Sequence, residues 1–257
     1  MKVILQTLLF YVLTVCVFIL SDLWAKGLGE KYASHIAMAT AALFTFLLVI
    51  IFCRLRAIPL TEAGTVPDNG SPGRIITGFL AGLLMSCLQP GILMIMGYVK
   101  LQFNAFDPHV IGLHMLLFTL ISCREELVFR SYALRSLADR FGAGSAQLFI
   151  AALFVFEHIW GGMNWWMALI GSGTGALLFG YAALKSKGIG LPLGLHTAWN
   201  MGQWCWGGKG DAGIFTQRIT AGREALSEVI GLSVFVGAAL FAGLAIAYYY
   251  KRSVQSR

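Results

Sequence analysis

The sequence predicts an all-α, polytopic membrane protein, a helical bundle with about eight transmembrane helices. Of its 257 residues, 58% are hydrophobic and only 12% are charged, whereas about 25% of the residues in a typical soluble domain are charged. Several apolar runs approach the roughly 20 residues that a helix needs to cross a bilayer. Because these runs lack the alternation of polar and apolar residues typical of barrel strands, we expect helices rather than a barrel.

The first three apolar runs cover 3–20, 35–53 and 75–97. The first follows Lys2, and we expect it to remain as a membrane helix because no small-residue cleavage site comes after it. Two arginines end the second run. The third contains a Pro-Gly pair, which neighbouring membrane helices can accommodate.

The other five expected helices share the same length range and are separated by short turns or polar loops. A Gly-Gly-Met-Asn turn separates the fifth from the sixth, and the eighth ends in three tyrosines, as in an aromatic belt at a membrane interface. They cover about 109–137, 145–160, 165–184, 189–206 and 228–250. We interpret 1–257 as a single integral membrane domain, with its motifs in a core of about 109–206.

The basic residues indicate the orientation of the chain. One set of helix ends carries eleven lysines and arginines, the other carries six, and Arg124 and Arg130 lie inside a helix. The positive-inside rule then places both termini in the cytoplasm, and we expect a bacterial inner membrane. The net charge of +7 is spread over the helix ends without a dense basic run, which favours contact with anionic lipid and argues against nucleic-acid binding.

The most unusual stretch lies inside the fourth expected helix, where Arg124, Glu125, Glu126 and Arg130 interrupt an apolar run. Each charge at the centre of a membrane helix costs about 2.5–3.5 kcal/mol on insertion scales, so such residues usually face a cavity or a partner. The spacing of Glu126 and Arg130 puts them on one helical face as a pair. Glu125 points about 100° away from Glu126 and is left for another role.

Two further helices carry polar side chains at a similar depth. His158 lies on the fifth expected helix, and His196 and Asn200 lie one turn apart on the seventh. Each alone is also consistent with an ordinary helix–helix hydrogen bond. Counted from the inner ends of their helices at 1.5 Å per residue, these residues and Glu125 all lie roughly 12 to 20 Å deep. The shared depth predicts one polar site.

The three motifs Glu125-Glu126-x-x-x-Arg130, Phe154-x-x-x-His158 and His196-x-x-x-Asn200 occur in this order on three hydrophobic segments. Together they resemble the CPBP family of intramembrane proteases, the CAAX-protease and bacteriocin-processing family. The resemblance implies a hydrolase that cuts a peptide bond at the membrane. It implies that Glu125 is the base that activates water and that His158 helps to hold the water. His196 and Asn200 would stabilise the oxyanion, and Glu126 and Arg130 would support the site.

Several alternatives stay open. Glu125, His158 and His196 could supply three zinc ligands, but no H-E-x-x-H motif is present, and we favour a metal-free, glutamic-type mechanism without a cofactor. The expected partner is a membrane-anchored protein or peptide, and we rank bacterial peptides and sorting tails above prenylated proteins. A membrane transporter or proton relay would also bury Glu, His and Arg, although the paired broken helices of many transporters are missing.

Overall fold

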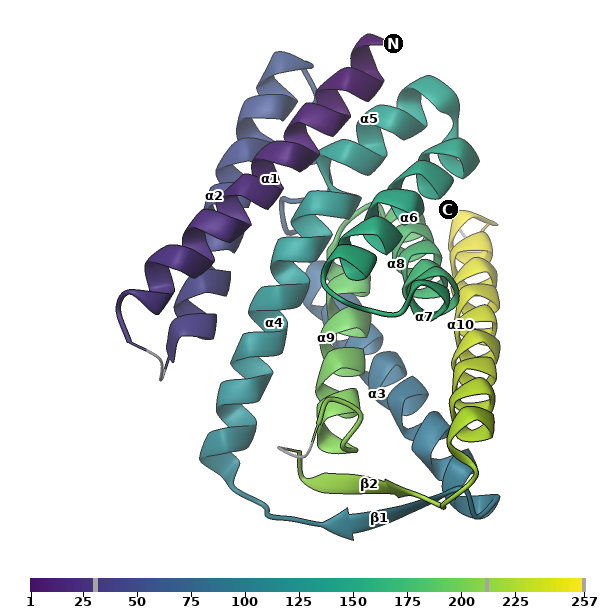
Figure 1. The fold of residues 1–257 in the computed structure, drawn as a ribbon. Coiled ribbons are helices and arrows are strands. Elements are labelled where there is room, and N and C mark those ends of the chain that lie inside the picture. The colour runs from purple at the N-terminus through teal and green to yellow at the C-terminus, as the bar shows by residue number, and fades with distance from the viewer. Residues whose placement is uncertain (30–31, 211–212, 256–257) are drawn as a thin grey trace.

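Helices form most of the computed structural model, which describes residues 1–29, 32–210 and 213–255 (Figure 1). The expected all-helical membrane fold is confirmed. Lys31 and Arg257, two residues of the charge count, lie outside the described part of the chain. In chain order the elements are α1 (Lys2–Lys26), α2 (Ala33–Leu55), α3 (Ser71–Ile95), β1 (Val99–Phe103), α4 (Pro108–Arg130), α5 (Tyr132–Phe141), α6 (Ala143–Trp160), α7 (Trp165–Met167), the π-helix η2 (Ala168–Ser172), α8 (Gly173–Ser186), α9 (Gly190–Cys205), β2 (Phe215–Ile219) and α10 (Glu224–Gln255).

Six helical segments of the described chain are long and apolar enough to cross a membrane, so the protein is a multi-pass membrane protein. They are α1, α2, α3, α6, the segment α7–η2–α8, and α10. The other two expected membrane helices are α4 and α9, which hold most of the expected site. Four charged residues make α4 less apolar, and α9 has only 16 residues. The helices that carry the chemistry are therefore those least suited to face lipid.

Flanking helices surround α4 and α9. Figure 1 shows α1 and α2 side by side along one flank of the bundle and α10 along the other. Three aromatic rings join α1, α2 and α5, with centroid distances of 5.3 Å for Phe10–Phe52, 5.2 Å for Phe10–Tyr132 and 5.3 Å for Phe52–Tyr132. All three side chains are buried. Because α5 begins directly after α4, this aromatic cluster anchors the C-terminal end of α4.

The prediction of a single helix over 109–137 is wrong in one respect. The helix α4 ends at Arg130, and a separate helix, α5, begins after Ser131. The backbone of Ser131 has φ −90° and ψ −119°, and its hydroxyl donates to the carbonyl of Leu127. The following helix α5 is amphipathic: Leu134 and Leu137 are buried, whereas Arg140 is exposed. Ending α4 at Arg130 lets α5 turn its apolar face to the bundle and its charges outward. In Figure 1, α5 lies at the end of the bundle where the N-terminus is found.

A two-stranded sheet closes the opposite end of the bundle, in segments that the sequence indicated only as loops. β1 pairs antiparallel with β2 in a register that sets Val99 opposite Ile219 and Phe103 opposite Phe215. Because the two strands are separated by more than 100 residues, neither has a local pairing signal. The N-terminus and the C-terminal end of α10 lie away from this sheet (Figure 1).

Candidate active site

The end of α4 holds a fully buried ion pair. Arg130 Nε lies 3.5 Å from Glu126 Oε2, and both side chains are 0% exposed. Three phenylalanine rings surround the guanidinium, with their centres 4.8 Å (Phe154), 5.5 Å (Phe129) and 5.6 Å (Phe179) from its central carbon. Aromatic faces attract a cation when water is excluded. The rings and the carboxylate thus fix the position of Arg130, and Arg130 in turn keeps Glu126 from being an isolated buried charge.

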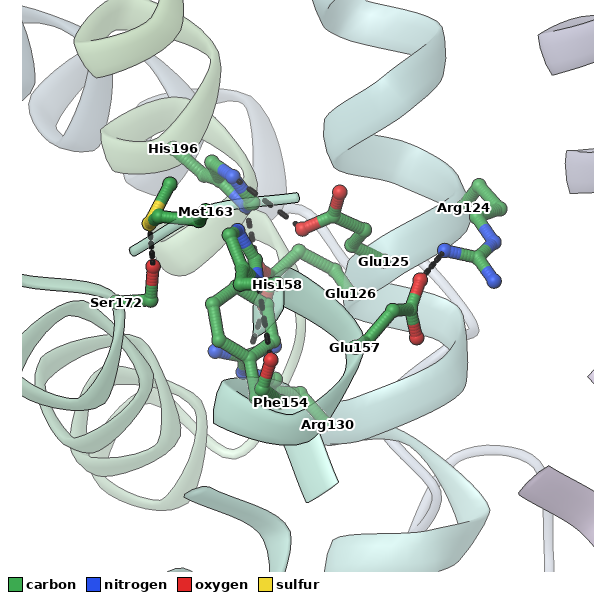
Figure 2. A network of polar contacts seen from close by, with 10 residues as sticks. All are labelled: Arg124, Glu125, Glu126, Arg130, Phe154, Glu157, His158, Met163, Ser172 and His196. Atoms are coloured by element: carbon green, nitrogen blue, oxygen red, sulfur yellow. Dashed lines mark hydrogen bonds and ion pairs between the residues drawn. The ribbon is translucent and has the colours of Figure 1, made fainter. Parts of the chain in front are cut away.

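His196 links the two adjacent carboxylates of α4 (Figure 2). Its Nδ1 lies 3.0 Å from Glu126 Oε1, and its Nε2 lies 3.6 Å from Glu125 Oε2. A carboxylate oxygen accepts hydrogen bonds, so Nδ1–H donates to Glu126, and the other ring nitrogen faces Glu125. Phe179 stacks on the imidazole at 4.7 Å between ring centres. Contacts on an edge and on a face therefore orient the His196 ring.

The charges of this network are not balanced by arginine alone. If Glu125 and Glu126 are both ionised, they exceed the single positive charge of Arg130 by one unit. Uncompensated charge in a buried site is costly, and uptake of a proton is the usual remedy. Glu125 is thus the carboxylate of this network whose ion-pair partner is a histidine and not an arginine, and a carboxylate so placed is a candidate for general acid–base chemistry.

α6 supplies His158 one turn after Phe154. The Nδ1–H of His158 donates to the backbone carbonyl of Phe154 over 2.9 Å, so Nε2 is the nitrogen left for other contacts. Figure 2 shows its ring beside the contact between Glu125 and His196. Among the hydrogen bonds and ion pairs of the described residues, Glu125 is joined to His196 and not to His158.

His158, His196 and Asn200 line one cavity of about 320 Å³. Along α9, His196, Asn200 and Gln203 follow at helical spacing on one face, so hydrogen-bonding groups form a stripe along one wall. Most of the remaining wall is apolar: Phe154, Met163, Met167, Phe179, Trp199, Leu232 and Phe235. An apolar cavity with a few convergent polar groups is typical of a ligand or substrate site.

Glycines set the position of α9 against α3. A β-carbon added at Gly194 would lie 2.1 Å from the Ile75 carbonyl oxygen, and one at Gly78 would lie 2.2 Å from that of Leu191. The two helices therefore touch backbone to backbone, as small residues permit in membrane proteins. His196 lies two residues after Gly194, or about 200° around the helix. The face opposite the glycine contact is thus turned toward α4 and the cavity.

The three residues that we considered as zinc ligands do not fit a three-ligand site as they stand. Within the described ranges, no group of three or more His, Cys, Asp and Glu side chains could hold a metal ion. His196 uses Nδ1 for Glu126, and His158 uses Nδ1 for the Phe154 carbonyl. No step below runs through a metal.

Sequence reasoning left several neighbours of the site without a role. Arg124, 4% exposed in its side chain, forms an ion pair with Glu157, which precedes His158 on α6 (Figure 2). The opposite charges of Arg124 and Glu157, at a similar depth on two helices, could have been used to predict this ion pair. Lys209, by contrast, lies in a polar loop, and only the fold brings it to the cavity.

Comparison with known families adds one finding. Residues 107–202 match the family described as Rce1-like, type II CAAX prenyl endopeptidase. The matched segment begins at the residue that caps α4 and ends within α9. It therefore contains Glu125, Glu126, Arg130, His158, His196 and Asn200. No curated protein matches the chain.

Proposed function

Because residues 107–202 belong to the Rce1-like CAAX endopeptidase family, which implies a membrane endopeptidase, we propose that the protein hydrolyses its substrate with water activated by Glu125. The observation that carries this proposal is the position of His196, 3.6 Å from Glu125 and 3.0 Å from Glu126 beside the cavity. A purely structural ion pair would need Glu126 and Arg130 alone. Glu125 adds a second acid, and among the described residues its ion pair is with His196 and not with an arginine or a lysine.

In the proposed reaction, Glu125 takes a proton from a water molecule as the water oxygen attacks the carbonyl carbon of the scissile peptide bond. The new C–O bond forms, and the carbonyl oxygen becomes an oxyanion. Glu125 then gives the proton to the leaving nitrogen as the C–N bond breaks, which restores the carboxylate. His158, with Nε2 left for other contacts, would hold the water in the attacking position.

Asn200 and His196 would stabilise the oxyanion. Asn200 is 8% exposed and lines the cavity one helical turn from His196. The carboxylate of Glu126 accepts the hydrogen bond from Nδ1–H of His196 and so orients the ring, with Nε2 on the opposite edge. Loss of one oxyanion-hole donor of this kind costs about 10²–10³ in kcat. Glu126 and Arg130 are positioning residues in this mechanism, because they act on the substrate only through His196.

The substrate in this proposal is a protein or peptide held at the membrane, consistent with a cavity inside a multi-pass membrane protein. Substrates of this kind include a prenylated C-terminus, a bacteriocin leader and a sorting tail with a transmembrane anchor, and we rank the last two above the first. The N-terminus and the C-terminal end of α10 both lie away from the sheet, which supports placing the two ends of the chain in one compartment. The distribution of basic residues favours the cytoplasm as that compartment, and we propose a bacterial inner membrane.

The test is cleavage of anchored peptides by the purified protein in proteoliposomes. A library with randomised residues beside either a C15 isoprenoid-modified cysteine or a single transmembrane helix would be incubated with wild type and with Glu125→Gln. Mass spectrometry should find products with wild type and none with Glu125→Gln. Glu62→Gln, a change at an exposed residue of a distant loop, should cleave like wild type. Cleavage by a folded Glu125→Gln protein would overturn the mechanism, and proton-coupled solute uptake that depends on Glu125 would favour the transporter reading.

A further inference from the structure

Arg124 and Glu157 form an ion pair beside the site that the mechanism above does not use (Figure 2). Arg124 directly precedes Glu125 on α4, and Glu157 directly precedes His158 on α6. In the part of the chain that the structure describes, no other hydrogen bond or ion pair between side chains joins these two helices. The pair is therefore the polar link between the helix that carries the proposed base and the helix that carries the proposed water-binding histidine.

The first helix supports this ion pair from one side. The ring centre of Phe18 on α1 lies 4.8 Å from the central carbon of the Arg124 guanidinium. The side chains of the pair are 4% (Arg124) and 23% (Glu157) exposed. Because little water reaches these groups, the cation–π contact and the ion pair are both stronger than at an exposed site. A ring face and a carboxylate thus hold the guanidinium in one place.

The directions of the side chains separate the ion pair from the reacting groups. Neighbouring residues of a helix project about 100° apart, so Arg124 and Glu125 point in different directions, and the same holds for the corresponding pair on α6. Figure 2 shows the ion pair on the side of Glu125 that faces away from His196. Among the described residues that line the cavity, neither member of the ion pair is found. Arg124 and Glu157 can therefore act on a substrate only through the residues that follow them.

Rotation of α4 about its axis is the movement that the ion pair opposes. The outer groups of helix side chains lie about 5–6 Å from the axis, so a rotation of about 10° moves the Glu125 carboxylate by about 1 Å. A misplacement of this size can lower a rate by about 10²-fold. The same rotation would pull the Arg124 guanidinium away from Glu157. The attraction between the two charges therefore keeps Glu125 at a fixed angle to α6.

Stability alone does not account for an ion pair in this place. Taking two charges out of water is costly, and replacing a buried ion pair by neutral side chains of similar volume is often neutral or stabilising. We propose that Arg124 and Glu157 are positioning residues that set the distance between Glu125 and His158, and so the place of the attacking water. This inference rests on the proposed endopeptidase function.

The experiment measures cleavage of one library peptide as an anchored reporter in proteoliposomes, together with the melting temperature and the folded fraction of each protein. The test variants are Arg124→Met, Glu157→Gln and the double variant that combines them and leaves neither charge unpaired. Arg124→Lys keeps a cation opposite Glu157. The matched control, Asp22→Asn/Lys26→Met, removes an ion pair of α1 whose side chains are 37% (Asp22) and 66% (Lys26) exposed.

The double variant should melt close to wild type but lose about 10- to 100-fold in kcat per folded molecule at unchanged KM, because alignment is lost and binding is not. Each single variant should lose about as much as the double variant, since either change removes the same link. Arg124→Lys and the control should keep the kcat of wild type.

A folded double variant with the kcat of wild type would overturn the proposal, as would a loss confined to KM or to the melting temperature. Failure of all three test variants to fold would also overturn it, because the pair would then serve stability. The proposed function is tested separately in the same assay by Glu125→Gln. If that variant loses cleavage while the double variant keeps it, the positioning role fails and the mechanism stands.

Discussion

Removal of the Arg130 charge is the most direct test of how the site is held together. In Arg130→Met, Glu126 keeps its place with a side chain that is 0% exposed but loses its cationic partner. Breaking a buried ion pair by deleting one member costs about 3–5 kcal/mol, because the remaining charge is left uncompensated. The three phenylalanine faces that surround the guanidinium would then contact a thioether, so most of their packing is kept. We therefore attribute the expected loss to electrostatics.

The double variant Glu126→Leu/Arg130→Met separates stability from activity. Removal of both charges should recover most of the lost stability, with a coupling energy of about 2–3 kcal/mol between the two positions. Activity should not recover, because His196 loses the acceptor that receives its Nδ1–H at 3.0 Å.

The free energy of unfolding would be measured in mixed micelles with increasing SDS, and activity with the anchored reporter peptide. The reasoning fails if Arg130→Met lies within about 1 kcal/mol of wild type, or if the two single changes simply add in the double variant.

Two further predictions concern packing and catalysis. Gly194→Val should lower folded yield and melting temperature sharply, because a β-carbon would lie 2.1 Å from the Ile75 carbonyl oxygen, whereas Gly237→Ala, at a glycine with open space, should melt like wild type. Asn200→Ala should reduce kcat by about 10²–10³ with little change in the unfolding midpoint, and a fall below tenfold would remove Asn200 from the oxyanion site.

The helices of this protein could be predicted because their signals are local. In lipid, the backbone of an apolar run of about 20 residues can satisfy its hydrogen bonds only within the run, as it does in a helix. Two features of the fold were not predicted, because each depends on contacts between segments that are far apart in the chain. The break at Ser131 follows from how α5 packs through Tyr132 on Phe10 and Phe52, not from a proline or glycine in α4. The sheet joins segments more than 100 residues apart, and pairing at that range leaves no periodic pattern in either strand.

The candidate site was predicted in part. Four polar residues on three helices at one depth indicated a shared site, and the cavity does collect His158, His196 and Asn200. Helical spacing predicted that Glu126 and Arg130 share one face of a helix, but the contacts between side chains of different helices were not open to the same reasoning. Depth along a helix follows from residue counting at 1.5 Å per residue, but which side chains meet depends on how each helix is rotated about its axis.

By itself, the sequence determined that the chain is a multi-pass helical membrane protein and which residues are too polar to face lipid, because hydrophobicity and helical spacing are properties of single segments. Only the tertiary structure decided that one imidazole lies between two neighbouring carboxylates and that Lys209 reaches the same cavity. The physical reason is that these contacts depend on the close approach of α3 and α9 through glycine and on a turn supported by β2. Such contacts are fixed by packing between segments that are far apart in the chain.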